Sequence, residues 1–402
     1  MMPVFDKALE LVLESVEKLD AMELPLSSCC GRALAEDVHS DIDMPPFDRS
    51  AMDGYALCGE APSYLIKGGI HAGEPSGIEL GPGEAASIMT GAPVPPGADR
   101  VLMKECAILE GGRLKASEMP SAGAHICRRA EDIEKGDRVL EAGIDIEPRH
   151  LGIAAMAGRA VLRVVRAVRA GILTTGSEVV PPGSIPGSGQ VRNANLPMLE
   201  GLLTTAGFEC SASLHSADDP RGIREAFERL LADSDVVLAA GGISLGDRDC
   251  VAPSLESVGA RFLFREVAIK PGKPLSFGMA AGKPVFGLPG NPVSVLCTFE
   301  EFVLPALRKM SGFARFERLR LQGISCFDHS QKPGRHNLLR VIAMPGLCWE
   351  LALPPSSGSG DLMSTNSANA IAHVSAERTG IAPGDTLSFS LFHSAGPDLS
   401  FT

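Results

Sequence analysis

The middle of the chain carries four polar, glycine-rich stretches whose composition suits the binding of an anion. Glycines let backbone N–H groups approach a phosphate or an oxyanion, and a helix that begins directly after such a loop adds partial positive charge. The stretches are TTGSE (174–178), SADDP (216–220), GGISLGDRD (241–249) and the pair KPGKP (270–274) and LPGNP (288–292). Their candidate substrate-binding residues are Gly241, Gly242, Ser244, Lys270, Lys273, Pro289 and Asn291.

Three carboxylates in these stretches, Glu178, Asp218 and Asp249, follow successive predicted strands. Mg²⁺ binds few carboxylates and keeps several waters, so these residues are candidates for holding a hydrated divalent cation. A second interpretation of Asp218 stays open, because Asp218 and Asp219 precede Pro220 and an Asp in that position commonly caps a helix.

Lys270 and Lys273 are separated by Pro-Gly, so a stiff turn is expected to direct both ammonium groups toward one ligand. The alternative is a pair of solvated surface lysines, which is the commoner case when such a pair is taken alone.

A second cluster of polar residues lies in the N-terminal half, in DMPPFDRSAMDGYA (43–56). Polar side chains among Pro, Gly and Met are costly to bury without partners, so they are expected to face a site, although a plain turn is the alternative. TGAP (90–93) and RRAED (128–132) are similar stretches that, taken singly, are more often structural. The candidates in this half are Asp53, Thr90, Arg128, Arg129 and Asp132.

Other common kinds of site have no signature in the sequence. The nine histidines show no metal-ligand or triad spacing, no G-x-S-x-G or Walker loop is present, and the ten cysteines include no C-x-x-C pair. Histidine-based catalysis is therefore not expected. The cysteines are interpreted as structural thiols of a protein in the reducing cytoplasm.

An α/β pattern over residues 166–312 must position the central loops. Apolar runs at 168–173, 235–240 and 284–288 predict parallel strands, and the segments 195–206, 220–232 and 292–310 predict helices. Open parallel sheets bind ligands at the carboxyl ends of their strands, so the loops are expected to meet at one edge of a three-layer α/β domain.

Regions with other patterns flank that domain. A helix at 3–20, a strand at 22–26, a short helix after Ser27 and a helix at 148–158 are expected in an N-terminal region formed by residues 1–42 and 141–165. Turn-rich residues 43–140 predict an inserted, mostly β domain. Residues 313–402, with apolar runs at 319–324, 338–343, 349–353, 370–374 and 386–392, predict a small, barrel-like β domain. The expected fold class is multidomain α/β plus β.

Composition excludes some partners. The chain has 402 residues and a formal net charge of −12, which argues against broad binding to nucleic acid. No apolar run approaches the roughly 18 residues of a membrane span. Acidic residues run through the first predicted helix, so a secretory signal is not expected there.

Eight motifs, in this order, closely resemble those of the molybdopterin molybdenumtransferases, the MoeA family, which shares its fold with the E domain of gephyrin. They are PPFDRSAMDGYA, TGAPVPPGAD, RRAEDI, TTGSE, the Asp218-Asp219 turn, GGISLGDRD, KPGKP and LPGNPVS. The resemblance covers essentially the whole chain. It implies a Mog-like, molybdopterin-binding central domain and a homodimer of four-domain subunits, in which the α/β domain of one subunit meets the N-terminal region of its partner.

The resemblance also implies a reaction. Family members take adenylylated molybdopterin and molybdate, release AMP in a Mg²⁺-dependent step and form molybdenum cofactor; molybdopterin adenylyltransferase and recipient molybdoenzymes are the implied protein partners. The implied catalytic residues are Asp53, Asp132, Glu178, Asp218 and Asp249, with Thr90, Lys270, Lys273 and Ser359 beside them. Which carboxylates hold Mg²⁺ and which bind the pterin stays open.

Four positions depart from the family pattern: Arg49, Ala130, Ser177 and Glu266. Glu266 precedes KPGKP where relatives commonly carry Lys or Arg, and strand alternation predicts that Arg265 faces the opposite side. Weaker oxyanion binding is the expected consequence.

Three alternative functions remain. One is a scaffold that keeps the fold without catalysis, and another is a tungstate-inserting paralogue. The third is a molybdopterin adenylyltransferase or a competence-damage-type pyrophosphatase, which accounts for TTGSE and GGISLGD but not for PPFDRSAMDGYA or the C-terminal β region.

Overall fold

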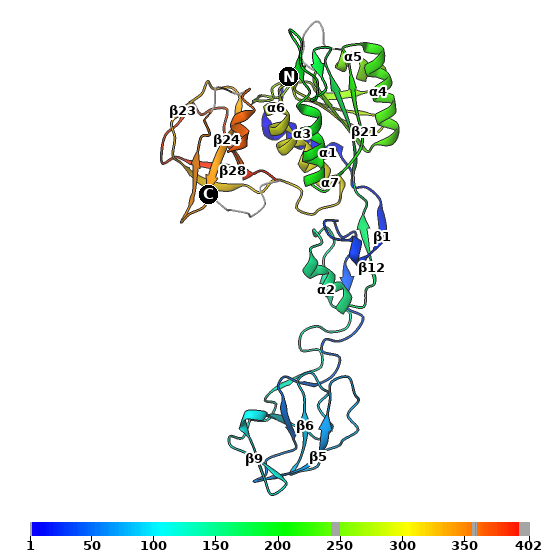
Figure 1. The fold of residues 1–402 in the computed structure, drawn as a ribbon, viewed down its shortest axis with the longest axis vertical. Helices are drawn as coiled ribbons and strands as arrows, with labels where there is room; N and C mark the ends of the chain where they lie inside the picture. The colour runs from blue at the N-terminus through cyan, green and yellow to red at the C-terminus, as the bar shows by residue number, and fades with distance from the viewer. Residues whose placement is uncertain (1, 243–249, 356–357, 359, 394–402) are drawn as a thin grey trace.

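The fold is described from a computed structural model, for residues 2–242, 250–355, 358 and 360–393. An α/β domain and a small β-barrel lie at one end of an elongated molecule, and an arm made by the N-terminal half extends away from them (Figure 1). The observed mixture of α/β and β regions confirms the predicted fold class.

The α/β domain is built on a six-stranded sheet in the order β16-β13-β17-β21-β20-β18. Strands β16 (Glu209–Ser216), β13 (Arg169–Thr175), β17 (Val236–Ala240) and β21 (Lys283–Leu288) are parallel, as the apolar runs predict. Strands β20 (Ser276–Ala280) and β18 (Arg261–Phe264) add an antiparallel edge. The hairpin of β20 and β21 separates KPGKP from LPGNP.

Helices cover both faces of this sheet, so the predicted three layers are present. One core joins alternate strand residues such as Ile172 and Leu238 to α1 (Phe5–Ser15), α3 (Asn195–Thr205), α6 (Pro292–Thr298) and α7 (Leu304–Met310). The opposite core joins the intervening residues, such as Leu173 and Val237, to α4 (Pro220–Asp233) and α5 (Val251–Ser257).

Three predicted helices differ from the observed ones. The first ends at Ser15 rather than near residue 20, because Val16 is already extended and buried in the core. The expected helix after Ser27 is a single 3₁₀ turn, Leu26–Ser28, which follows Pro25 and precedes the left-handed Gly31. The predicted helix at 292–310 contains a π-helical segment, Phe299–Val303, between α6 and α7.

The arm begins with a ribbon of two antiparallel strands, β1 (Ala21–Pro25) and β12 (Val161–Val165), which pack with α2 (Pro148–Met156). Farther out, β2 (Val38–His39) pairs with β11 (Arg138–Leu140), and β3 (Arg49–Ser50) pairs with β10 (Ile126–Cys127). The arm ends in a six-stranded sheet. Its order is β7 (Arg100–Met103), β4 (Gly54–Leu57), β6 (Glu84–Ile88), β5 (Tyr64–Ile70), β9 (Arg113–Ala116) and β8 (Ala107–Glu110).

The C-terminal strands close into a barrel, as predicted. They run in the order β24 (His336–Met344), β25 (Trp349–Ala352), β22 (Leu321–Ser325), β28 (Thr386–Leu391) and β26 (Ala370–Val374), and β26 pairs again with β24. Strand β19 (Ile269–Lys270) comes from the α/β region and adds to β24, and β23 (His329–Ser330) pairs with β27 (Gly380–Ile381).

In the part of the chain that the structure describes, no helix has the length and apolar character needed to cross a membrane. The division of the chain at residues 42, 140, 165 and 312 stays a prediction.

Candidate functional site

The carboxyl edge of the parallel sheet holds a cavity of about 620 Å³, which we call the sheet-edge cavity. It brings together Glu178, Asp218 and the adjacent Gly241 and Gly242, which follow three different strands, β13, β16 and β17. Gly290 and Pro292 also line it, so LPGNP reaches the same edge. The predicted convergence is therefore observed for TTGSE, SADDP, LPGNP and the first two residues of GGISLGDRD, whereas KPGKP does not line this cavity. Ser244 and Asp249 lie outside the described residues.

Asp218 and Asp219 have different tasks. Asp219 caps α4, because its carboxylate accepts hydrogen bonds from Arg221 N at 3.4 Å and Gly222 N at 2.9 Å. Asp218 instead accepts from Ser177 N at 3.0 Å, and its own backbone N–H donates to Ser177 Oγ at 3.1 Å. The capping interpretation therefore applies to Asp219, and Asp218 is left to line the cavity. Ser177, one of the departures from the family pattern, holds Asp218 in place.

Two glycines permit the close approach of neighbouring loops. Gly241 and Gly242 both adopt positive φ angles, +97° and +54°, and a Cβ on Gly241 would lie 2.6 Å from Thr175 O. No larger residue fits there without moving the backbone. The backbone of Gly241 and Gly242 therefore packs directly against Thr175, and these residues line the cavity together.

Sequence reasoning missed several residues of this cavity. Asn193 is 7% exposed and donates to Thr174 Oγ1 at 2.9 Å, which fixes the start of α3 beside the cavity. Asn195 donates from Nδ2 to Gly290 O at 2.8 Å, and its buried Oδ1 has no hydrogen-bond partner. Thr175 Oγ1 is likewise buried without a partner. The signal that could have found the asparagines is the N-x-N ahead of an apolar helical run.

A divalent cation fits the chemistry of this cavity. Glu178 and Asp218 supply carboxylates, and the unpartnered Thr175 Oγ1 and Asn195 Oδ1 supply neutral oxygens. Oxygen donors of this kind are what Mg²⁺ prefers. Within the described ranges no group of three or more His, Cys, Asp or Glu residues is arranged to hold a metal, and the third predicted ligand, Asp249, falls in the undescribed segment 243–249.

Asn291 has a structural role, and its predicted role in substrate binding stays a prediction. Its Oδ1 accepts from Val293 N at 2.9 Å and Ser294 N at 3.4 Å, so the oxygen caps α6. Its Nδ2 faces the barrel, because a Cβ on Gly360 would lie 2.9 Å from that atom. The barrel loop around residue 360 thus reaches the sheet edge next to Pro289 and Gly290. Ser359 is outside the described residues.

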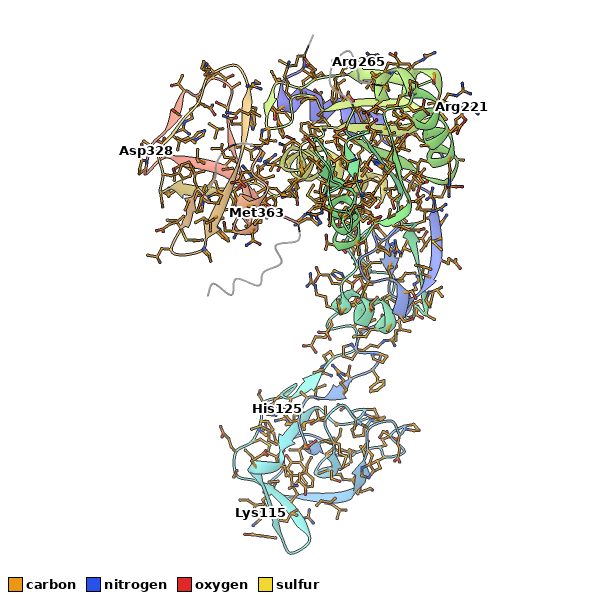
Figure 2. All side chains as sticks on the ribbon, turned by 45° about the horizontal axis from the view of Figure 1, so that its top comes forward. Lys115, His125, Arg221, Arg265, Asp328 and Met363 are labelled. Atoms are coloured by element: carbon orange, nitrogen blue, oxygen red, sulfur yellow. The ribbon has the colours of Figure 1, made fainter. Side chains whose placement is uncertain are left out.

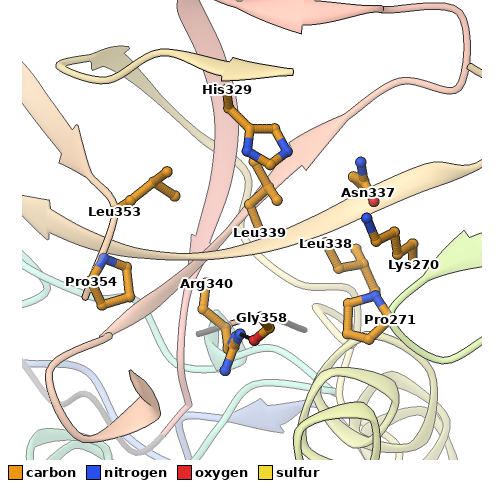
Figure 3. A pocket seen from close by; sticks show the side chains of 10 residues that line it. All are labelled: Lys270, Pro271, His329, Asn337, Leu338, Leu339, Arg340, Leu353, Pro354 and Gly358. Atoms are coloured by element: carbon orange, nitrogen blue, oxygen red, sulfur yellow. Dashed lines mark hydrogen bonds between the residues drawn. The ribbon is translucent and has the colours of Figure 1, made fainter. Parts of the chain in front are cut away.

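A second cavity, of about 320 Å³, lies where Lys270 and Pro271 meet the barrel, and we call it the inner cavity (Figure 3). Strand pairing sets Lys270 opposite Asn337, and Arg340 follows on the same strand, β24. Arg340 donates to Asp361 O and Ser364 Oγ, each at 2.6 Å, and to Gly358 O at 3.2 Å. Sequence reasoning missed Arg340, whose only signal is a cation within the apolar run LLRVIAM.

The two lysines of KPGKP do not face the same cavity. Lys270 lines the inner cavity, whereas Lys273 forms an ion pair with Glu266 at 3.0 Å. Arg265 pairs with Glu256 and lies 4.7 Å above the ring of Phe262, so it points toward another side, as expected. Because β18 ends at Phe264, strand alternation does not itself govern residues 265 and 266.

The arm brings together the other predicted residues. Asp53 Oδ1 accepts from Thr90 N at 2.7 Å and from Thr90 Oγ1 at 2.9 Å, and these hydrogen bonds lower the pKa of Asp53 below its usual value. Asp53 is therefore a fixed, exposed anion at physiological pH.

Arg128 and Arg129 hold the arm's loops together. Arg128 pairs with Asp48 and Arg129 with Asp43, each at 2.6 Å. Asp132 donates from its backbone to Met44 O at 3.0 Å, so it belongs to the same junction. Both arginine side chains are more than half exposed and can exchange these partners for a bound anion.

One chain does not bring the arm cluster to the sheet-edge cavity. His125, near the arm cluster in sequence, and Lys115 lie at one end of the molecule, while Arg221 and Arg265 of the α/β domain lie at the other (Figure 2). A site that uses both clusters needs a second chain.

Comparisons with known proteins agree with this architecture. Residues 4–158 match the family model "MoeA N-terminal region (domain I and II)", and residues 171–309 match "Probable molybdopterin binding domain". The molybdopterin molybdenumtransferase of Haemophilus influenzae is 36% identical over 79% of this chain and 80% of its own length. That of Nostoc sp. is 31% identical over 95% of this chain and 92% of its own length.

A crystal structure of the molybdopterin biosynthesis moeA protein from Pyrococcus horikoshii superposes with a TM-score of 0.85. The two sequences are 28% identical, and the superposition covers 98% of this chain and 100% of that one. Fold, motif order and extended identity to curated transferases thus agree, and the chain belongs to the molybdopterin molybdenumtransferase (MoeA) family.

Proposed function

We propose that this protein transfers molybdenum from molybdate to adenylylated molybdopterin in a Mg²⁺-dependent step that releases AMP and yields molybdenum cofactor. The observation that carries the proposal is the pairing of two neighbouring cavities with complementary chemistry. The sheet-edge cavity supplies carboxylates and backbone N–H groups, and the inner cavity supplies the cations Lys270 and Arg340.

The sheet-edge cavity suits the phosphoanhydride of the substrate. The backbone of Gly241 and Gly242 can approach phosphate oxygens closely because neither residue has a Cβ. Glu178 and Asp218, with Asp249 as the third predicted ligand, would hold Mg²⁺, which when bound screens the phosphates and polarises the anhydride. Direct attack of water on the adenylyl phosphorus breaks the anhydride P–O bond and releases AMP and molybdopterin phosphate. If a molybdate oxygen attacks this phosphorus instead, molybdopterin phosphate leaves first, and water then hydrolyses the adenylyl-molybdate to AMP and molybdate.

The inner cavity suits the oxyanion. Lys270 contributes a point charge, and Arg340 contributes a planar guanidinium whose position is fixed by hydrogen bonds to Gly358 O, Asp361 O and Ser364 Oγ. Neither cation forms an ion pair with any residue that the structure describes, so both charges are available to a dianion. Molybdate and tungstate have the same charge, and the assay below therefore compares them.

A homodimer completes the site in this proposal. Asp53 directly precedes β4 and Thr90 follows β6, and the sheet that contains these strands lies at the opposite end of the molecule from the α/β domain (Figure 1). An antiparallel arrangement of two chains would carry the arm cluster to the partner's α/β domain. Molybdopterin adenylyltransferase and recipient molybdoenzymes are the proposed protein partners, and the cytoplasm is the proposed location.

The test is a purified assay with adenylylated molybdopterin, Mg²⁺ and either molybdate or tungstate, measuring AMP release and metal bound to the pterin. We expect Glu178→Ala and Asp218→Ala to abolish AMP release while the circular dichroism and the oligomeric state stay unchanged. Glu225→Ala, an exposed carboxylate on α4 that pairs with Arg221, is the control and should keep full activity.

Two results contradict the proposal. Unchanged turnover in Glu178→Ala and Asp218→Ala would remove these carboxylates from the mechanism. A wild-type protein that binds molybdopterin but releases no AMP with either oxyanion would favour the scaffold function.

A further inference from the structure

A third cavity, of about 380 Å³, lies on the barrel beside the inner cavity, and we call it the outer cavity. It shares Lys270 and Asn337 with the inner cavity. Every other lining residue also carries a hydrogen-bond donor on its side chain, and no carboxylate is among them. The complete lining is Lys270, Ser330, Gln331, Lys332, Arg335 and Asn337.

The loop that supplies these residues is braced by hydrogen bonds on both sides. The Gln331 side chain donates to Ser375 O at 3.0 Å and Arg378 O at 2.6 Å, and it accepts from Asn337. The backbone bonds Gln331 N to Thr379 O, Gly334 N to Ala376 O and His336 N to Ala268 O measure 2.8–2.9 Å. Lys332 and Arg335 are therefore presented from a preorganised loop, which lowers the entropy cost of binding a ligand.

The positive charge of the outer cavity is not neutralised from within the described part of the chain. Lys270, Lys332 and Arg335 form no ion pair there, although acidic residues are close along the neighbouring turn. Glu377, on the turn that braces the loop, is hydrogen bonded to Ser375, and Asp385, on the turn that follows β27, pairs with Arg378 at 2.7 Å. Three cations around one cavity repel one another, and a bound anion would relieve that repulsion.

We propose that the outer cavity is a second anion subsite, which binds a phosphate-class dianion through Lys332, Arg335 and Lys270. Its existence does not depend on the proposed function; only the identity of the natural ligand does. The same chemistry has two sources in the proposed reaction, a free tetrahedral oxyanion or the phosphoryl group of the nucleotide. Because the Lys270 ammonium serves both cavities, an anion in one weakens binding in the other.

The experiment is equilibrium dialysis of the full-length protein at low ionic strength with labelled phosphate, molybdate or AMP. Lys332→Gln combined with Arg335→Gln should weaken phosphate binding at the outer cavity at least tenfold and change the affinity of the molybdate site at the inner cavity less than twofold. Arg340→Gln should do the reverse, and Lys270→Gln should weaken both. Arg113→Gln combined with Lys115→Gln, which removes two cations at the far end of the arm, is the charge-matched control.

The AMP measurements identify the source of the ligand. AMP that binds at least tenfold more tightly than phosphate, with the difference lost in the Lys332/Arg335 variant, identifies a nucleotide phosphoryl subsite. Equal affinities identify a subsite for a free oxyanion.

Two outcomes overturn the inference. The first is phosphate binding that survives in the Lys332/Arg335 variant while its circular dichroism is unchanged. The second is an equal loss of phosphate affinity in the Arg113/Lys115 control, which would show that the attraction is diffuse and electrostatic. A wild-type protein that releases no AMP but shows the variant-specific loss of phosphate binding would contradict the proposed function and leave the subsite standing.

Discussion

At the scale of single residues, Glu266 is an internal counterion for a cation of the predicted anion site. Its pair with Lys273 spans 3.0 Å, and both side chains are partly exposed. Exposed pairs contribute only about 0.2–1 kcal/mol, so an anion can displace Glu266 at a modest cost. If Lys273 helps to bind an oxyanion, as predicted from the sequence, this pair would weaken the attraction without removing it.

This pair leads to a prediction about substrate affinity. Glu266→Gln frees Lys273 and should lower the KM for molybdate by up to about fivefold, the factor that corresponds to about 1 kcal/mol. Glu266→Lys should lower it further. Glu256→Gln, which frees Arg265 on another side of the domain, is the matched control. A KM that stays the same or rises in Glu266→Lys would show that residue 266 does not act on the site.

The sequence predicts the carboxylates and glycines of the sheet edge because each one follows its own strand, so local order is enough to place it. Arg340 could not be placed in this way. It meets Lys270 only because β19 pairs with β24 across a long stretch of chain.

Ala130 is one of the departures from the family pattern, which has Gly at this position. It adopts a φ of +60°, a conformation that costs a non-glycine residue about 1–2 kcal/mol.

At the scale of elements, Gly54 allows β4 to lie between β6 and β7 directly after Asp53. A Cβ at this position would be 1.9 Å from Leu102 O, which belongs to the backbone of β7 and cannot rotate away. The glycine of the first motif is thus a requirement of sheet packing.

Gly54→Ala should therefore destabilise the arm by about 3 kcal/mol, at the upper end of the cost of overpacking. The chain's two tyrosines, Tyr55 and Tyr64, both lie in the arm, so tyrosine near-ultraviolet circular dichroism in a urea titration reports its unfolding. Gly201→Ala, in α3 with open space around the added methyl group, should be neutral or slightly stabilising. Equal midpoints for both variants would contradict the packing argument.

The π segment shows where prediction of an element fails. Periodicity over 292–310 predicts one helix, because a single inserted residue changes the apolar spacing only slightly. In the structure the segment buries two consecutive acids completely. Glu300 pairs with Arg318, and Glu301 pairs with Arg320 at 2.7 Å. Both arginines precede the barrel, so their positions depend on how the barrel packs on the α/β domain.

At the scale of the whole molecule, a buried group of histidines and acids joins the barrel to the α/β domain. His336 and His373 share a hydrogen bond of 3.1 Å, and the His336 ring stacks on Phe5 of α1. Burial lowers the pKa of His336 to about 4, with Arg320 lowering it further and Asp6 and Glu377 opposing that change. Burial also lowers the pKa of His373 well below its usual value, so both imidazole rings are neutral at pH 7.

This interface should weaken in acid. The unfolded chain takes up the proton near pH 6.5 and the folded chain only near pH 4, so the stability due to His336 is present above pH 6.5 and is lost as the pH falls toward 4. We expect a loss of about 2 kcal/mol between pH 7.5 and pH 5 from His336 alone. Trp349, the single tryptophan, lies in the barrel and reports its unfolding in urea.

His336→Gln keeps a hydrogen-bonding side chain that does not titrate. The loss of unfolding free energy between pH 7.5 and pH 5 should therefore be smaller in this variant by about 2 kcal/mol. Burial raises the pKa of Glu301 to about 7, and a raised carboxyl pKa favours the folded state at low pH. This effect opposes that of His336, but it is present in the wild type and in His336→Gln and therefore cancels when the two are compared. An unchanged pH dependence in His336→Gln would rule out His336 as its source.

The separation of the arm cluster from the sheet edge predicts complementation between inactive chains. Asp53→Ala and Glu178→Ala should each be inactive alone. In a mixed dimer, however, one of the two composite sites has both residues intact. Random exchange of equal amounts should restore about a quarter of the wild-type AMP release. No recovery, with mixed dimers verified by mass spectrometry, would mean that both residues act within one chain or that they do not act at all.

The sequence predicts the order of the regions well, because turn density and strand spacing are local properties. It does not predict how the regions are arranged, which depends on contacts between distant segments. The first helix illustrates this: its position in the sequence predicts that it belongs to the N-terminal region with the arm, yet Phe5, Ala8 and Val12 are buried in the core of the α/β domain.

The way the arm is attached to the α/β domain affects how far its outer end can move. The chain leaves the α/β domain through β1 and returns through β12, and the near end of the arm is held where Leu19 N donates to Met310 O at 2.8 Å. A two-stranded ribbon twists more strongly than a wider sheet and is only marginally stable by itself. A small rotation at the base of the ribbon becomes a large displacement at Asp53. In the proposed dimer, the stiffness of this ribbon would therefore set how accurately the Asp53 carboxylate is placed at the sheet edge of the partner chain.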